Sequence, residues 1–227
     1  MKTKGIISEK EFKKLVKTHL DITLSLRSQK KFMLYLNELR SWNRRINLIS
    51  RKKDKPGDIY CHFVDSLLAL KAFQIPEFSR ILDLGSGSGF PAIPLKIIRG
   101  DLDITMIESI RKKVLFLKKM IELLKFEGMA IYQKRLEELQ HLSEFNGRFD
   151  FVTAKAFGKL KETIYISLPF LKNNGILIAY KGISFKSEII ELLQEKEKMN
   201  LQIKDIKFFE IAEAGLKRFL VLIQKTS

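Results

Sequence analysis

A glycine-rich turn between a strand-like and a helix-like segment most constrains the fold of this chain. It reads DLGSGSGFPAIPL, residues 83–95, with Gly85, Gly87 and Gly89 at alternate positions. Glycine adopts a positive φ in a tight turn, and without a Cβ it lets a ligand approach backbone N–H groups. The amino end of the following helix adds a partial positive charge. The sequence therefore predicts a ligand-binding turn between a strand and a helix.

Strand-like and helix-like segments alternate after this turn, which predicts an α/β fold. The expected strands lie at 80–84, 103–108, 129–133, 149–156, 175–182, 201–210 and 218–224. Such alternation favours a Rossmann-like, mostly parallel seven-stranded sheet with helices on both faces. Only a short polar turn separates the last two strands, so we expect them to form an antiparallel hairpin at one edge.

The first third of the chain has helical spacing instead. Apolar residues recur at intervals of three and four, for example at Phe12 and Leu15. Asp58 follows a polar turn and is expected to be the N-cap of a third helix. We therefore expect an N-terminal helical extension over 1–72 and a Rossmann-like domain over 73–227, packed as one compact unit.

The charge of the chain indicates a polyanionic partner. Forty-two basic against twenty-six acidic side chains leave a net charge of +16. An excess of this size favours nucleic acid, although lysine-rich solvated faces also produce it without any partner.

The same sequence excludes several classes of protein. Cys61 is the one cysteine, so no intramolecular disulfide can form. The N-terminal segment has no apolar core typical of a signal peptide, and no apolar run approaches the ~20 residues that span a membrane. We expect a soluble, cytoplasmic monomer with no membrane association.

The spacing of the glycines distinguishes between cofactors. A dinucleotide site favours G-x-G-x-x-G, whereas this chain has Gly85-x-Gly87-x-Gly89 preceded by Asp83. Glu108 ends the next expected strand, where a carboxylate can accept hydrogen bonds from ribose hydroxyls. This arrangement resembles motif I and its acidic partner in class I S-adenosylmethionine-dependent methyltransferases.

A more specific resemblance covers about residues 30–223. The segments that carry it are WNRRINLIS, HFVDSLL, DLGSGSGFPAIPL, IESIRKKVLFL, KRLEEL, TAKAF, YKG and RFLVLI. In this order they resemble the signature blocks of the RsmG (GidB) family, with GFPAIPL the most distinctive. That resemblance implies a bacterial 16S rRNA methyltransferase that modifies N7 of a guanine near the decoding region.

The resemblance also implies which residues contact S-adenosylmethionine. Lys155 stands where the family usually has an arginine, which keeps the charge but removes the planar fork. The implied cofactor-binding residues are Gly85, Gly87, Gly89, Phe90, Glu108, Ser109, Leu136, Glu137 and Lys155.

The implied chemistry needs no proton acceptor. The sequence shows no nucleophile–base pair and no metal cluster, and N7 of guanine has a free lone pair and no proton to lose. Direct in-line attack on the methyl group then depends on alignment. The candidates for positioning are Asn43, Asn47, Lys155 and Lys181. Asn43 and Asn47 are equally well explained as helix caps.

Basic residues near the end of the extension are candidates for phosphate contacts, with a solvated face as the alternative. Together with one arginine in the KRLEEL segment, the candidates for RNA binding are Arg44, Arg45, Arg51, Lys52, Lys53 and Arg135. His62 and Asp65 lie three residues apart, and we expect a structural hydrogen bond there that fixes the extension over the cofactor.

Other functions fit parts of the sequence. The cofactor site is compatible with another RNA, a protein or a small molecule as the methyl acceptor. A basic RNA-binding module with a vestigial pocket is a further alternative, against which the intact glycines and Glu108 argue.

Overall fold

The computed structural model describes residues 7–50, 54–135, 138, 143–195 and 201–226. Its helices are α1 (Glu9–Leu20), α2 (Leu26–Asn43), α3 (Pro56–Ala72), α4 (Ala92–Ile98), α5 (Arg111–Leu123), α7 (Leu160–Ser167) and α8 (Lys186–Glu195). Its strands are β1 (Arg80–Leu84), β2 (Asp103–Glu108), β3 (Met129–Gln133), β4 (Phe149–Lys155), β5 (Leu171–Lys181), β6 (Leu201–Ile211) and β7 (Leu216–Lys225). Short 3₁₀ turns lie at Ser143–Phe145, Leu168–Phe170, Ile183–Phe185 and Ala212–Ala214.

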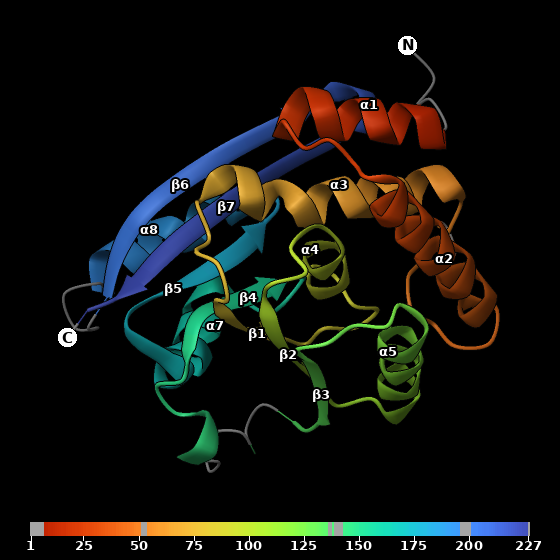
Figure 1. Ribbon diagram of the computed structural model, residues 1–227. Helices are drawn as coiled ribbons and strands as arrows, with labels where there is room; N and C mark the ends of the chain where they lie inside the picture. Colours follow the sequence, from red (N-terminus) through yellow and green to blue (C-terminus); the bar gives the residue numbers. More distant parts are fainter. Residues whose placement is uncertain (1–6, 51–53, 136–137, 139–142, 196–200, 227) are drawn as a thin grey trace.

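Across this described part of the chain, the strands form one sheet in the order β3-β2-β1-β4-β5-β7-β6 (Figure 1). Strands β1 to β5 pair in parallel, whereas β7 is antiparallel to both β5 and β6. The seven-stranded α/β fold and the terminal hairpin are thus confirmed. Strand β1 lies between β2 and β4, so the turn that follows β1 lies in the middle of the sheet edge. A doubly wound fold binds its ligand at this position.

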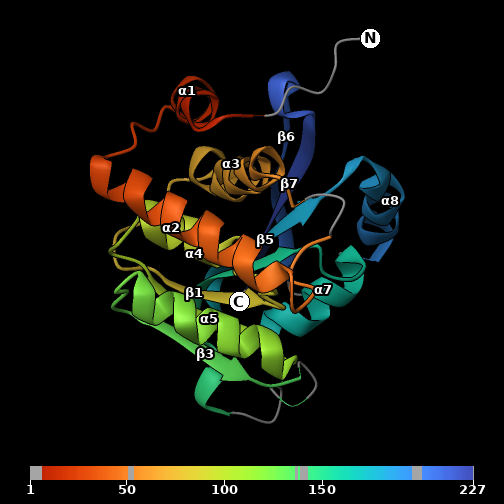
Figure 2. The same cartoon turned by 90° about the vertical axis from the view of Figure 1, so that its right-hand side faces the viewer.

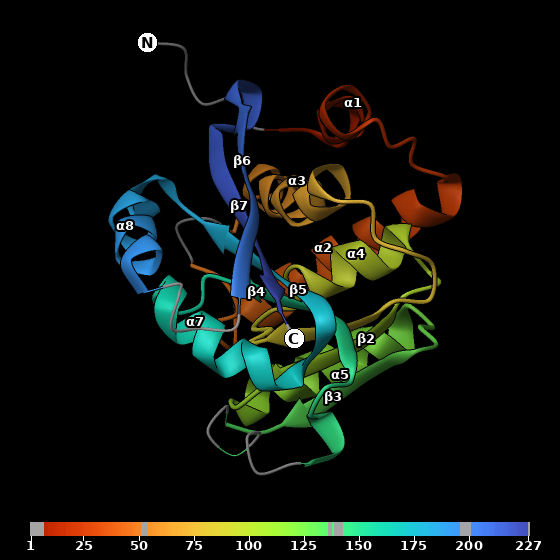
Figure 3. The ribbon, with the colours of Figure 1, turned by 90° about the vertical axis from the view of Figure 1, so that its left-hand side faces the viewer.

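Helices cover both faces of the sheet because its central strands are apolar on both sides. In β1, Ile81 packs with the core beneath α1 to α5, and the next residue, Leu82, packs with the core beneath α7 and α8. Ile178 and Ala179 divide in the same way on β5. Figure 3 looks along the β6–β7 edge and shows α7 and α8 on one side of the sheet, with α2, α3 and α4 on the other.

The N-terminal helices pack on one another through aromatic rings. Phe12 of α1, Phe32 of α2 and Phe63 of α3 are all buried, and their ring centroids lie 4.9 to 5.8 Å apart. Two tyrosine hydroxyls add specific links between the layers. Tyr35 of α2 donates to the carbonyl of Ser88 at 2.5 Å, and Tyr180 of β5 donates to the carbonyl of Ser66 at 2.7 Å. The extension therefore braces the glycine turn directly.

One helix begins earlier than its sequence predicts. Helix α3 starts at Pro56 with Lys55 as N-cap, so the expectation that Asp58 is the N-cap was wrong. Proline is favoured in the first turn, where its missing N–H has no partner to lose. Asp58 lies within that first turn, where its charge favours the helix dipole.

Within the described residues, no helix is both long and apolar enough to cross a membrane.

Candidate active site

The glycine turn connects the carboxyl end of β1 to α4, and its three glycines all have positive φ. The values are +63° for Gly85, +58° for Gly87 and +95° for Gly89. A Cβ at Gly89 would lie 2.5 Å from Cδ1 of Ile93, closer than real contacts allow. Glycine is therefore required at this position by both conformation and space.

Glu108, at the end of β2, holds this turn by its carboxylate. Oε2 accepts a hydrogen bond from the N–H of Gly87 at 2.9 Å, and Oε1 accepts one from the N–H of Ile110 at 2.9 Å. The side chain is buried. The acid that the sequence places 23 residues after Gly85 thus reaches the glycine turn, as the resemblance implies.

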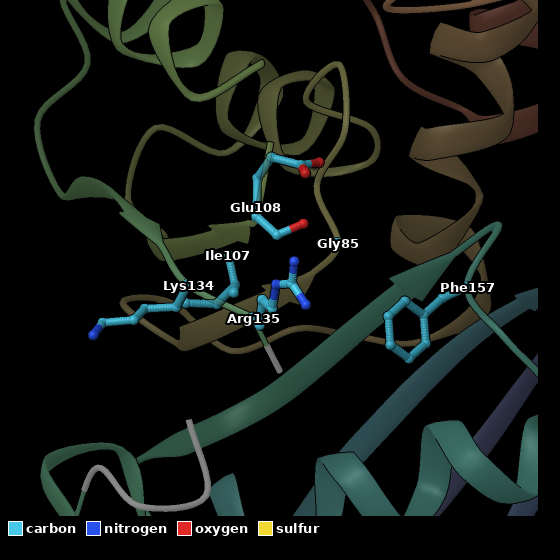
Figure 4. A pocket seen from close by; sticks show the side chains of 7 residues that line it. Gly85, Ile107, Glu108, Lys134, Arg135 and Phe157 are labelled. Carbon is cyan, nitrogen blue, oxygen red and sulfur yellow. The ribbon is translucent and has the colours of Figure 1, made fainter. Parts of the chain in front are cut away.

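A cavity of about 340 Å³ opens beside this pair (Figure 4). Its lining residues come from the carboxyl ends of neighbouring strands and from the segment after β4: Gly85, Ile107, Glu108, Ser109, Lys134, Arg135 and Phe157. Figure 4 shows the Phe157 ring across the cavity from Glu108, and the Arg135 guanidinium directed toward Glu108. An acid, bare backbone and an apolar ring suit a nucleoside, so these residues fit the adenosine part of S-adenosylmethionine.

A buried acid lies beneath the turn. Asp83 is fully buried, and its Oδ1 accepts a hydrogen bond from the Thr153 hydroxyl at 2.7 Å. Oδ2 has no hydrogen-bond partner among the described residues. Burial raises the pKa of Asp83 to about 7, although Ser86, Thr153 and Lys155 oppose the rise. The motif marks Asp83 as the acid before the glycines, but no signal in the sequence predicts that one of its buried oxygens has no hydrogen-bond partner.

A second acid, Asp65 of α3, joins the extension to the sheet. Arg218 of β7 donates to it from Nε at 2.8 Å and from Nη2 at 2.9 Å, and Nζ of Lys155 lies 3.1 Å from Oδ2. Burial would raise the pKa of Asp65, but the two cations outweigh it and hold that pKa below its usual value. Burial in turn lowers the pKa of Lys155, against the attraction of Asp65. Asp65 thus links the extension to the sheet through Arg218 and Lys155, and the expected hydrogen bond between His62 and Asp65 stays a prediction.

Lys155 brings this network to the cofactor turn. Its Nζ lies 5.0 Å from the ring centroid of Phe90, the residue that follows Gly89. The His62 ring also stacks on Phe90, with centroids 5.3 Å apart. Phe90 therefore lies between the extension and β4, in contact with both.

The positioning candidates occupy different environments. Oδ1 of Asn43 accepts hydrogen bonds from the N–H groups of Leu48 and Ile49 at 2.9 and 3.0 Å, and the side chain is 1% exposed. Asn43 thus stabilises the turn after α2, as the cap alternative expects, whereas Asn47 is exposed.

Lys181 is also held within the protein. Its Nζ donates to the Gly158 carbonyl at 2.8 Å and to Glu188 at 2.9 Å. Glu188 also accepts a hydrogen bond from the N–H of Leu160. Lys181 therefore fixes the segment between β4 and α7, and its contact with cofactor or RNA stays a prediction.

The RNA-binding candidates lie at the surface where they are described. Arg44 and Arg45 are exposed after α2, and Arg135 is exposed at the cavity rim. Arg51, Lys52, Lys53, Leu136 and Glu137 lie outside the described residues. No group of three or more metal-ligating side chains occurs in the described ranges.

Solved structures share this fold. TYW2 of M. jannaschii, in complex with AdoMet, superposes with a TM-score of 0.52 at 18% identity, over 71% of this chain and 74% of that chain. A SAM-dependent O-methyltransferase of Thermotoga maritima gives a TM-score of 0.55 at 13% identity, over 85% and 71%. TYW2 of P. horikoshii superposes with a TM-score of 0.52 at 13% identity, over 68% of this chain and 60% of that chain. These likenesses, all under 25% identity, show the fold of the chain.

Sequence comparison identifies the family. The family model described as "GidB: rRNA small subunit methyltransferase G" matches residues 28–218. A ribosomal RNA small subunit methyltransferase G of Syntrophus aciditrophicus is 32% identical over 206 residues, 91% of this chain and 85% of the relative. Its counterpart in Geobacter sp. strain M21 is 34% identical over 218 residues, which are 96% of this chain and 98% of the relative. The chain belongs to this family.

Proposed function

We propose that this methyltransferase transfers the methyl group of S-adenosylmethionine to N7 of a guanine in 16S rRNA, near the decoding region. The observation that carries the proposal is the family match over residues 28–218, joined to a cavity that combines glycine backbone with Glu108. The net charge of +16 suits an RNA substrate. Such a substrate places the enzyme in the cytoplasm.

The cavity residues suit the cofactor's parts. Glu108 and Ser109 would hold the ribose, and the N–H groups of the glycine turn would face the bound molecule. Asp83 offers an unpaired carboxylate oxygen beneath that turn, suited to a cationic group. The cofactor supplies an electrophilic methyl group when bound.

The protein's own contribution is alignment and exclusion of water. Guanine N7 attacks with its lone pair and releases no proton, so no side chain has to act as a base. Both oxygens of Glu108 already accept backbone hydrogen bonds, which fits a binding role better than proton transfer. Phe90, packed between His62 and Lys155, gives the site a fixed apolar wall. Rate enhancement then comes from holding N7, carbon and sulfur in line.

A methyl-transfer assay tests the proposal. Purified protein and radiolabelled S-adenosylmethionine are mixed with small ribosomal subunits, protein-free 16S rRNA or tRNA, all from cells lacking the enzyme. Label in 7-methylguanine of a single 16S fragment is the expected result, with a rate that is flat above neutral pH. Label in tRNA, or in another atom of 16S rRNA, overturns the proposed substrate, and a rate that rises log-linearly with pH overturns the base-free mechanism.

A further inference from the structure

A second cavity has a volume of about 360 Å³. It is enclosed by the first turns of α2, the end of α4 and the segment after α5. Figure 2 shows α2 and α5 side by side, with the first turn of α2 at the opposite end of the molecule from the carboxyl end of β3. None of the residues that line this cavity also lines the cavity beside Glu108. This cavity is therefore no part of the cofactor site.

Basic side chains dominate its lining. Arg27, Lys31, Lys96 and Lys125 face it, against the single acid Glu127. In the described part of the chain, no carboxylate lies within 4.0 Å of the charged nitrogens of these four side chains. Four cations and one acid leave an excess of three positive charges around the cavity.

Lys96 fixes one of these charges inside the protein. The residue is 3% exposed, and its Nζ donates to the carbonyl of Gly100 at 3.0 Å and to that of Leu102. Carbonyl dipoles solvate the ammonium without neutralising it. Asp101 is already paired with Arg99 at 2.6 Å. Asp103 and Glu127 also attract Lys96, but among the described residues no carboxylate lies within 4.0 Å of its Nζ.

Lys31 is held by an aromatic ring and crowded by like charges. Its Nζ lies 4.4 Å from the ring centroid of Phe126, a cation–π contact that fixes the ammonium at the cavity wall. Arg27 lies four residues earlier on α2, so the two side chains share a face. Burial, with the repulsion of Arg27 and Lys96, lowers the pKa of Lys31. The first turn of α2 contains no acidic residue that would relieve this repulsion.

We infer that this cavity binds a backbone phosphate of the RNA substrate, held by Arg27 and Lys31 with Lys96 behind them. The inference rests on the proposed function, because it takes RNA as the substrate. A phosphodiester carries one negative charge and offers oxygens to both side chains. A phosphate contact outside the cofactor site would fix the orientation of a long RNA without reading its sequence.

The test compares two double variants that lose the same charge. Arg27→Gln/Lys31→Gln removes the two cations from the cavity, and Lys10→Gln/Lys14→Gln removes two exposed cations from α1. Affinity is measured as a function of KCl concentration with protein-free 16S rRNA. KM for the RNA and kcat are measured with the form that accepts methyl groups. Binding of S-adenosylhomocysteine and the melting temperature confirm that each variant is folded.

The cavity variant is expected to reduce the slope of log affinity against log salt by about 1 relative to the α1 variant, as loss of one phosphate contact does. Its KM for RNA rises several-fold, while kcat at saturating RNA and cofactor affinity stay at wild-type values. Equal slopes and equal KM in the two variants overturn the inference. A second result also overturns the inference: the two variants bind RNA equally, while inorganic phosphate raises the melting temperature of the wild type but not of the cavity variant. In that case the cavity binds a free anion and not the RNA.

The two proposals fail separately. Absence of methyl transfer by the wild-type enzyme to any 16S rRNA form overturns the proposed substrate. Transfer by the wild-type enzyme with no difference between the two variants overturns the phosphate site alone.

Discussion

The carboxylate of Asp65 and the ammonium of Lys155 form a buried ion pair, with Oδ2 3.1 Å from Nζ. The side chains are 2% and 7% exposed, so water screens the pair little. Asp65 belongs to the helical extension and Lys155 to the end of β4 beside Phe90. The pair, with Arg218 on the same carboxylate, therefore couples the packing of the extension to Phe90, the residue that follows the last glycine of the turn.

Replacing Asp65 should destabilise the fold strongly. Asp65→Asn leaves Lys155 and Arg218 without their carboxylate, and breaking a buried pair in this way costs about 3–5 kcal/mol. Adding Lys155→Met removes the buried charge, so the double variant should lose less stability than the sum of the single variants. Urea unfolding of all four proteins gives this double-mutant cycle. Additive losses would show that the pair is not coupled.

Glu108→Gln should weaken cofactor binding more than it weakens folding. The amide keeps the shape of the side chain but removes the charge from its hydrogen bonds, including those proposed with the ribose. Its NH2 group also cannot accept the hydrogen bond that one carboxylate oxygen takes from the N–H of Gly87 or Ile110. Loss of a charged partner is worth about 1.5–3 kcal/mol, so Kd for S-adenosylhomocysteine should rise roughly ten- to hundredfold. Isothermal titration calorimetry measures it. Glu122→Gln, an exposed residue on α5, is the matched control and should bind as wild type does.

Two glycines of the turn should differ in their tolerance of a methyl group. At Gly89, an added Cβ meets Ile93 at 2.5 Å and Leu117 at 3.1 Å, with φ at +95°. At Gly87, the nearest atom lies 3.8 Å away, with φ at +58°. Gly87→Ala should cost about 1–2 kcal/mol of unfolding free energy from backbone strain alone. Gly89→Ala should cost about 1–3 kcal/mol more, from overpacking. Equal unfolding free energies for the two variants would contradict this view of the turn.

The elements of the sheet could be predicted because their signals are local. Each buried strand is a short apolar run, and the glycine turn is marked by missing side chains. Glu108 follows from its place at the end of β2, since carboxyl ends of neighbouring parallel strands meet at one edge. The fold and the glycine turn could therefore be predicted without knowing which distant residues contact each other.

The partners of charged side chains could not be predicted in this way. Asp65 and Arg218 lie 153 positions apart, and only the order of the strands brings them together. Lys181 was expected at the site because it ends a strand, yet Glu188 on α8 faces it. Asp58 failed as an N-cap because a proline two residues earlier begins the helix. In each case tertiary packing decided what the residue type alone left open.

Asp83 should make the stability of the ligand-free protein depend on pH near neutrality. Its pKa is about 7 in the folded chain against 3.8 for the ordinary carboxyl group. Below pH 3.8 both states hold the proton, so the raised pKa contributes its full stability there. Between the two values only the folded state binds the proton, and the contribution falls as pH rises, until it is lost above about 7.

Asp83→Asn removes this titration while keeping an acceptor for the Thr153 hydroxyl. The unfolding free energy of wild type, minus that of the variant, should fall by about 4 kcal/mol in total between pH 4 and pH 8. Urea unfolding at half-unit steps of pH, without cofactor, measures the difference. Glu108 is the acid that acts on Asp83 to raise its pKa, so Glu108→Gln should move the fall toward lower pH. Parallel curves for wild type and Asp83→Asn would show that Asp83 is already ionised throughout this range, and that its buried Oδ2 carries a full charge beneath the glycine turn.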